Sequence, residues 1–270
     1  MASVPSRVLA AFGAAGTPQV LTGGQGTSVA VNGLVLKPGA DLEEIVWLAG
    51  LCARIKPRGF RLPAPVPTVQ GELVVDGWSA MTLVAGGPVN DRDRSAEDWL
   101  SVLAAGRAFH RAVSREQRPA FLAARTHRWA VADRAAWGDP GPPSPGPRSE
   151  GMLDRLNQHL VDENLNDQLI HGDLSGNVLV SEGLAPAVID VSPYWRPAAY
   201  ADAVVVVDAI LWWQADSALL ELGQPRGLND RIWTSLLARA VAFRLLASQD
   251  LDEEFDRYER VARLLDSRER

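Results

Sequence analysis

Four polar residues in the second half of the chain have side chains of the kinds that phosphoryl transfer requires. His171, Asp173 and Asn177 follow one apolar segment and Asp190 follows a second, with the turn residues Ser181-Glu182-Gly183 between them. Such a reaction needs one carboxylate to orient or deprotonate the attacking hydroxyl, and a carboxylate and an amide oxygen to hold magnesium on the phosphates. The spacing predicts a β-hairpin that carries Asp173 for the first task and Asn177 and Asp190 for the second.

The same stretch resembles a known family of enzymes. His-Gly-Asp-Leu at 171–174, Asn-Val-Leu at 177–179 and Ile-Asp at 189–190 look like the catalytic loop and metal-binding aspartate of aminoglycoside phosphotransferases and related kinase-like small-molecule kinases. The resemblance implies an ATP-dependent phosphotransferase acting on a hydroxyl group of a small molecule, with ATP and Mg²⁺ as cofactors. It also implies an α+β, bilobal protein-kinase-like fold, with a small antiparallel-sheet N-lobe in residues 1–86 and a mostly helical C-lobe in residues 87–270.

The loop departs from the kinase pattern in its length. In protein kinases the asparagine follows the aspartate by five residues, whereas Asn177 follows Asp173 by four. Gly176 suits a tighter path because glycine reaches conformations that other residues avoid. Two alternatives accompany the main hypothesis: a catalytically inactive, kinase-like nucleotide-binding or regulatory protein, and an enzyme of the same fold that transfers a nucleotidyl group.

Residues around the loop are expected to support it. His171 is expected to brace the loop through hydrogen bonds rather than to act as a base. Asp202 and Asp208 either fix the loop from behind or serve as helix caps and surface acids. The short segment 191–197 leaves no room for a long activation loop, which favours a small-molecule kinase over a protein kinase.

The N-terminal part of the chain contains a glycine-rich turn between apolar segments. Residues 19–21 and 29–31 are predicted strands, and an Asn32-Gly33 turn joins the second of these to a strand at 34–37. Glycines between strands let backbone N–H groups approach phosphate oxygens. The residues predicted to bind the nucleotide in this turn are Gly24, Gln25, Gly26, Thr27 and Ser28.

The resemblance assigns further nucleotide contacts. Lys37 ends the third strand, where the kinase-like fold places a lysine that reaches the α- and β-phosphates. Glu44, with Glu43 as the alternative, is expected to pair with that lysine from the helix predicted at 41–55. A second hairpin, 71–75 with 78–84, leads to a hinge in which Thr82, Leu83 and Val84 would hydrogen-bond adenine.

Capping residues and apolar periodicity predict the helices. Asp41 is a candidate N-cap, and Ser95 with Asp98 forms a candidate capping box at the start of a helix over 95–113. The proline- and glycine-rich segment 138–149 is expected to be irregular. The remaining predicted helices cover residues 5–15, 121–137, 152–165, 198–213, 231–248 and 251–265.

Composition limits the possible partners and location. The net charge is −6 and basic residues are not clustered, which argues against binding of nucleic acid. The only cysteine, Cys52, excludes an internal disulfide and is an expected core residue. We find no convincing signal peptide or membrane span, so we expect a cytoplasmic protein with a small-molecule substrate and no membrane partner. The substrate and the oligomeric state stay open.

Overall fold

The computed structural model describes residues 4–21, 26–88, 95–140, 146–162 and 164–268. Contacts divide the chain into two compact units, Met1–Pro88 with Gly176–Asp190, and Val89–Ser175 with Val191–Arg270. A segment that is distant in sequence thus groups with the N-terminal part. The division into lobes at 1–86 and 87–270 stays a prediction.

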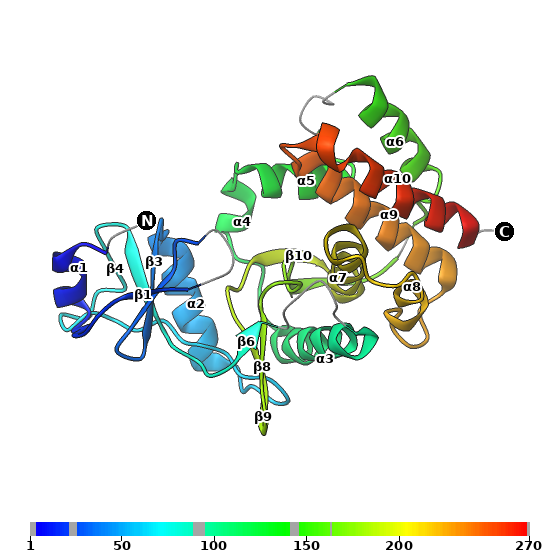
Figure 1. Cartoon of the computed structure of the whole chain (residues 1–270). Helices are drawn as coiled ribbons and strands as arrows, with labels where there is room; N and C mark the ends of the chain where they lie inside the picture. The colour runs from blue at the N-terminus through cyan, green and yellow to red at the C-terminus, as the bar shows by residue number, and fades with distance from the viewer. Residues whose placement is uncertain (1–3, 22–25, 89–94, 141–145, 163, 269–270) are drawn as a thin grey trace. The chain divides into compact units, whose positions relative to one another are not determined.

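The first unit contains a five-stranded antiparallel sheet with the strand order β1-β2-β3-β5-β4. Figure 1 labels β1, β3 and β4 of this sheet. Two tight turns set its register: Asn32 and Asp76 have left-handed backbones, with φ of 48° and 50°, and a glycine follows each. Turns of this kind match the twist of the strands they join. Both predicted hairpins are confirmed. The strands are β1 (Gln19–Val20), β2 (Val29–Val31), β3 (Leu34–Pro38), β4 (Val74–Val75) and β5 (Trp78–Thr82).

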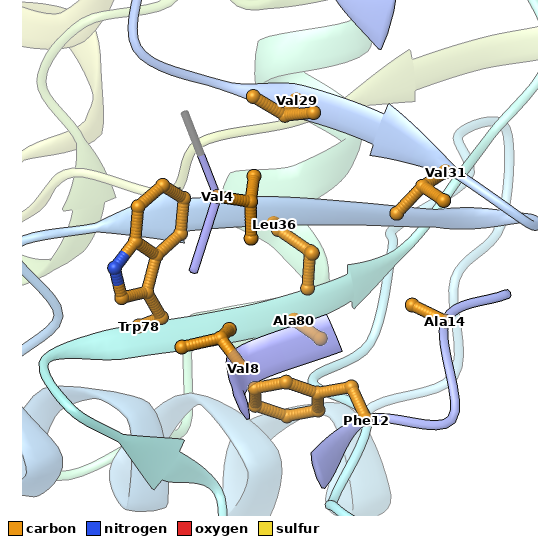
Figure 2. Close-up of a cluster of buried hydrophobic side chains, with 9 residues drawn as sticks. All are labelled: Val4, Val8, Phe12, Ala14, Val29, Val31, Leu36, Trp78 and Ala80. Carbon is orange, nitrogen blue, oxygen red and sulfur yellow. The ribbon is translucent and has the colours of Figure 1, made fainter. Parts of the chain in front are cut away.

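The N-terminal helix α1 (Ser6–Ala11) packs on this sheet through a cluster of buried hydrophobic side chains (Figure 2). Val8 of the helix and Leu36 of β3 have no exposed surface, and burying each such side chain contributes about 1.5–3 kcal/mol. The helix is shorter than predicted because Gly13, with φ of 61°, turns the chain into a left-handed conformation.

Helix α2 (Leu42–Arg54) begins where the sequence predicts. The backbone N–H of Glu44 donates to Oδ1 of Asp41 at 3.0 Å, so Asp41 is the N-cap. Leu48 and Leu51 are buried on its inner face. Burial raises the pKa of the Cys52 thiol to about 11, although a backbone hydrogen bond opposes this, which suits a packing residue rather than a nucleophile.

A second sheet in the first unit carries the predicted hairpin. Its strands have the order β6-β8-β9. Arg61, from the proline-rich connector, donates from Nε to the carbonyl of Ala185 at 2.6 Å and from Nη2 to that of Ala85 at 2.8 Å. These bonds explain why the hairpin groups with the N-terminal residues. The strands are β6 (Gly87–Pro88), β8 (Val178–Ser181) and β9 (Leu184–Val188).

The second unit is mostly helical and contains one strand pair, β7 with β10. Helix α7 is buried at every residue from Tyr200 to Leu211, as expected for a helix that is apolar all round. Helix α9 packs against α5, α6, α7 and α10. The elements are α3 (Ala96–Val113), α4 (Phe121–Ala124), α5 (Arg128–Ala136), α6 (Pro147–Asn157), β7 (Asp167–His171), β10 (Pro193–Pro197), α7 (Ala198–Trp213), α8 (Leu219–Leu222), α9 (Asp230–Ala247) and α10 (Leu251–Arg268).

Two predicted helices of this unit differ from the structure. The helix predicted over 121–137 is two helices, because the chain becomes extended at Arg125 and His127, and Nδ1 of His127 accepts the N–H of Ala130 to cap the second one. The helix predicted over 152–165 runs from Pro147 to Asn157, and proline suits its first turn because no N–H is needed there. The Ser95–Asp98 capping box is confirmed.

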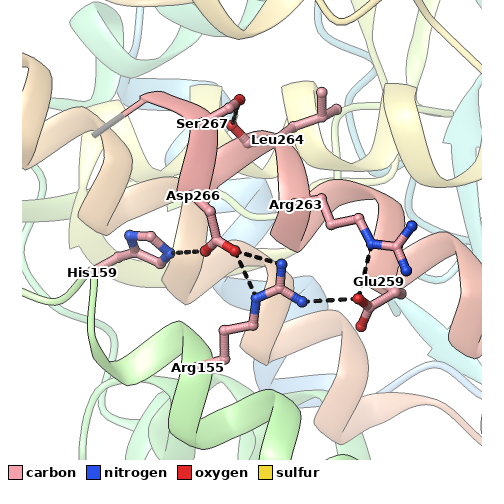
Figure 3. A network of polar contacts seen from close by, with 7 residues as sticks. All are labelled: Arg155, His159, Glu259, Arg263, Leu264, Asp266 and Ser267. Carbon is pink, nitrogen blue, oxygen red and sulfur yellow. Dashed lines mark hydrogen bonds and ion pairs between the residues drawn. The ribbon is translucent and has the colours of Figure 1, made fainter. Parts of the chain in front are cut away.

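A polar network connects α6 to α10 (Figure 3). Arg155 donates to Asp266 from Nε at 2.9 Å and to Glu259 from Nη1 at 3.0 Å, and His159 contacts the other oxygen of Asp266 at 3.0 Å. The hydrogen bonds to Arg155 hold the pKa of Asp266 below its usual value although burial opposes them. This network fixes the last helix of the described chain.

No helix in the described ranges has both the length and the apolar character that crossing a membrane requires.

Candidate active site

The carboxylate of Asp173 is accessible and yet held in place. Asp173 lies in the second unit, just after β7, and 52% of its side chain is exposed. Its Oδ1 accepts a hydrogen bond from Nη2 of Arg244 at 3.1 Å. Arg244 also binds both oxygens of Asp208, from Nε at 2.7 Å and from Nη2 at 2.5 Å. Asp173, the candidate base, is thus exposed to solvent and also hydrogen-bonded to the arginine of a buried ion pair.

Two buried histidines support the backbone around Asp173. The N–H of Asp173 donates to Nδ1 of His171, and the N–H of His171 donates to Nε2 of His110, both at 3.1 Å. Each accepting nitrogen must lack a proton. Burial, assisted by the charges of His171 and Arg111, lowers the pKa of His110 to about 3, so its ring is neutral near pH 7. The predicted bracing role of His171 is confirmed.

Asn177 and Asp190 lie at the same end of the β8–β9 hairpin, in the first unit. Val178 pairs with Val188, and the N–H of Ile189 donates to the carbonyl of Asn177 at 2.9 Å. Asp190 has a left-handed backbone with φ of 54°, a conformation that aspartate tolerates better than most non-glycine residues. The hairpin therefore brings Asn177 and Asp190 close together. The prediction that it also carries Asp173 was wrong, because Asp173 follows β7, and β7 pairs with β10.

Lys37 and Asp190 form an ion pair within the first unit. The strand β3 carries Lys37 opposite Ser79 of β5, and its Nζ contacts Oδ1 of Asp190. The side chains are 28% and 46% exposed, so solvent reaches both partners. Glu44 lies in the first turn of α2, and its predicted pairing with Lys37 stays a prediction.

The glycine-rich turn is described in part. Gly24 and Gln25 lie outside the described residues. Gly26 has a left-handed φ of 65°, and a hypothetical Cβ on it would have no described atom within 4 Å. The carbonyl of Ser28 accepts the N–H of Leu21 at 3.0 Å, which closes the turn between β1 and β2. The roles of Gly26, Thr27 and Ser28 in nucleotide binding stay predictions.

The predicted hinge follows β5. The N–H of Thr82 donates to the carbonyl of Ala64 at 3.0 Å, and the N–H of Leu83 donates to that of Gly33 at 2.8 Å. Two of the three backbone donors assigned to adenine are therefore used inside the unit. The side chain of Leu83 is exposed.

The donor set at the hairpin end fits magnesium. Within the described part of the chain, no group of three or more histidine, cysteine, aspartate or glutamate residues could hold a metal. Asp190 and Asn177 offer a carboxylate and an amide oxygen, and Mg²⁺ commonly takes only one or two protein carboxylates because phosphates and water complete its shell. Their role as ligands stays a prediction.

Two arginines that hold the hairpin and the Asp173 loop were not predicted from the sequence. Arg244 lies in the last turn of α9, 71 residues from Asp173, and Arg61 lies in the connector between α2 and β4. Neither has a local motif, although a basic residue at a fully buried helix position is a signal that a helical wheel can detect. Asp208 contacts the loop through Ser175, whose Oγ donates to it at 2.8 Å, while Asp202 pairs with Arg107 of α3 instead.

Solved structures share this fold. An aminoglycoside phosphotransferase from Alicyclobacillus acidocaldarius matches with a TM-score of 0.64 at 14% identity, over 100% of this chain and 94% of that chain. A microcompartment-associated aminopropanol kinase matches with 0.58 at 18% identity, over 98% and 95%. A thermostable mutant of another aminoglycoside phosphotransferase, in a ternary complex with AMP-PNP and hygromycin B, matches with 0.64 at 16% identity, over 99% and 98%. The expected α+β kinase-like fold is confirmed.

Comparison at the level of sequence gives the family. No curated protein sequence matches the chain significantly. The model of the phosphotransferase enzyme family matches residues 22–205, a range that includes Lys37, Asp173 and Asp190. Because this range covers more than half of the 270 residues, the chain belongs to the phosphotransferase enzyme family.

Proposed function

We propose that this protein is an ATP-dependent kinase that phosphorylates a hydroxyl group of a small molecule. The observation that carries the proposal is the carboxylate of Asp173, half-exposed and held by a buried arginine, in the motif whose resemblance implies a catalytic base. An enzyme that transfers a phosphoryl group through positioning needs such a fixed carboxylate.

In this proposal Asp173 accepts the proton of the attacking hydroxyl. The hydroxyl oxygen forms a bond to the γ-phosphorus of ATP, and the bond from that phosphorus to the oxygen of the leaving ADP breaks. Lys37 would release Asp190 and bind the α- and β-phosphates instead. Asp190 and Asn177 would hold Mg²⁺, which supplies positive charge to the phosphate oxygens.

The nucleotide would be held by residues of the first unit. Gly24, Gln25, Gly26, Thr27 and Ser28 are proposed to cover the phosphates, and Thr82, Leu83 and Val84 to contact adenine. Since the N–H groups of Thr82 and Leu83 already donate within the unit, we assign adenine recognition to the carbonyls of this segment and the N–H of Val84.

We propose a cytoplasmic location, where ATP is available, and a hydroxyl-bearing small molecule as substrate. The similar structures include an aminopropanol kinase and a complex with hygromycin B. An acceptor screen should therefore contain amino alcohols, aminoglycosides and neutral polyols.

The role of Asp173 is tested by Asp173→Asn. Loss of a general base typically lowers turnover by about 10²–10⁴-fold, while the affinity for ATP with magnesium should stay within about threefold, since one conservative change outside the nucleotide contacts removes no binding energy. Release of ADP in the presence of each acceptor measures turnover. Wild-type turnover in the variant would reject Asp173 as the base.

The nucleotide site is tested by calorimetric titration of ATP, with and without Mg²⁺, on the wild type and on Asp190→Asn. We expect magnesium-dependent binding that the variant loses. Binding without turnover of any acceptor would instead favour the inactive regulatory alternative. Mass analysis of a product distinguishes an added phosphoryl group from an added nucleotide.

A further inference from the structure

Arg244 is a charged residue in the interior of the second unit. Only 6% of its surface is exposed, and an unpaired charge in such a place is very unfavourable. Burial opposes its charge, but the carboxylates of Asp208 and Asp173 outweigh this and raise its pKa above the ordinary value for arginine. Arg244 therefore carries its positive charge near pH 7.

The guanidinium connects the helix α7 to the loop that carries Asp173. Nε and Nη2 bind the two oxygens of Asp208, and Nη2 also reaches Oδ1 of Asp173. Ser175, two residues further along the loop, donates its Oγ to Oδ2 of Asp208 at 2.8 Å. Both ends of the segment 173–175 are thus attached to a single ion pair.

Aromatic rings restrict the movement of the guanidinium. Its central carbon lies 5.4 Å from the ring centroid of Trp129 and 4.8 Å from that of Phe243. Arginine binds a carboxylate as a planar fork and stacks on rings, whereas lysine offers a single point charge. The geometry at this position therefore depends on the shape of the side chain as well as on its charge.

We propose that Arg244, locked by Asp208, is the positioning residue that fixes the orientation of the Asp173 carboxylate for phosphoryl transfer. This inference rests on the proposed function. Arg244 contacts the carboxylate of Asp173 through Nη2. It acts through Asp173, and a displacement of about 1 Å of a reacting group can cost about 10²-fold in rate.

The test compares Arg244→Lys and Arg244→Met with the control Arg107→Met. Arg107 also pairs with a buried aspartate of α7, Asp202, with Nε at 2.8 Å from Oδ2, and its Nη2 donates to the carbonyl of Gly223 rather than to the loop. We expect Arg244→Lys to lower kcat by about 10–100-fold and to leave the KM for ATP within about threefold. Arg244→Met should have a lower kcat still, and Arg107→Met should keep kcat within about threefold despite its loss of stability.

Failure of the proposed function and failure of the positioning role give different results in this test. A wild-type protein that transfers no phosphoryl group to any acceptor means that the proposed function fails. An active wild type with equal kcat losses in Arg244→Lys and Arg107→Met, or with no loss in Arg244→Lys, overturns the positioning role alone.

A double-mutant cycle tests the contact without any activity. Urea unfolding is measured for Arg244→Lys, Asp173→Asn and the double variant, since residues in contact have non-additive effects on the free energy of unfolding. Non-additivity supports the contact between Arg244 and Asp173. Additive effects overturn it even if turnover falls.

Discussion

The two ion pairs of the candidate site differ in their exposure to water. Arg244 and Asp208 in the second unit have side chains 7% and 3% exposed, whereas Lys37 and Asp190 in the first unit are 28% and 46% exposed. The buried pair is satisfied by further hydrogen bonds to Ser175 and Asp173. Lys37 has Asp190 as its partner in the described structure.

This difference matches the proposed tasks of the two groups. A buried, hydrogen-bonded pair is a fixed support, because removing one partner leaves an uncompensated charge. An exposed pair is worth little and can exchange partners, because water stabilises either ion alone. The residues for positioning are thus held rigidly, while those proposed to bind phosphates and metal can be released from each other by the ligand.

The largest contrast is expected in stability. Asp208→Ala leaves Arg244 buried without its main partner and should lower the free energy of unfolding by about 3–5 kcal/mol. Asp190→Ala removes a partner from the exposed pair and should change it by at most about 1 kcal/mol. Urea unfolding of both variants measures this. Equal losses of unfolding free energy in the two variants would mean that the exposure of an ion pair does not determine how much it stabilises this protein.

The pH dependence of stability tests whether a buried carboxylate that has an arginine partner, Asp202, is ionised in the folded protein. Burial raises the pKa of Asp202 to about 7 from 3.8, although Arg107 opposes the shift, and its Oδ1 receives no hydrogen bond from the described residues. Between these values the folded protein keeps a proton that the unfolded chain releases. The free energy of unfolding should therefore fall as the pH rises, by at most about 1.4 kcal/mol per pH unit.

Urea unfolding between pH 5 and 7 checks this dependence. Asp202→Asn should flatten the curve relative to the wild type. A variant with the wild-type slope would show that Asp202 is ionised in the folded protein.

The smallest expected effect concerns the exchange of partners at Lys37. The chain has only two lysines, Lys37 and Lys56, and the exposed Lys56 serves as an internal control. At an ATP concentration of ten times Kd, with Mg²⁺, acetylation of Lys37 should slow by roughly tenfold, since only the free protein reacts. Lys56 should react at an unchanged rate. Peptide mass spectrometry follows both, and equal rates at Lys37 with and without nucleotide would contradict the exchange.

Local chemistry allowed much of the fold to be predicted. The Asn32-Gly33 turn, the Asp41 cap and the Ser95–Asp98 capping box each depend on residues within a few positions, and each is present in the structure. The pairing of β10 with β7 was missed, because prolines at both ends of Pro193–Pro197 conceal a strand whose partner is more than 20 residues away.

The candidate site was predictable only where a motif is continuous. His171, Asp173 and Asn177 lie within a single loop, so their types and spacing were informative. The support of Asp173 by Arg244 could not be predicted, because the contact depends on how α9 packs against α7, and nothing near Arg244 in sequence specifies that packing. Long-range ion pairs follow from tertiary structure rather than from local propensity.

The left-handed backbone at Asp190 makes stability a weak constraint on this residue. A non-glycine residue with φ of 54° costs at most about 1 kcal/mol relative to glycine, which offsets the similar, small contribution of the exposed pair with Lys37, so Asp190→Gly should be nearly neutral for stability. That change would remove the proposed metal ligand. In natural variants or in libraries evolved only for thermal tolerance, the residue at 190 therefore reports whether the chain is still under selection for catalysis.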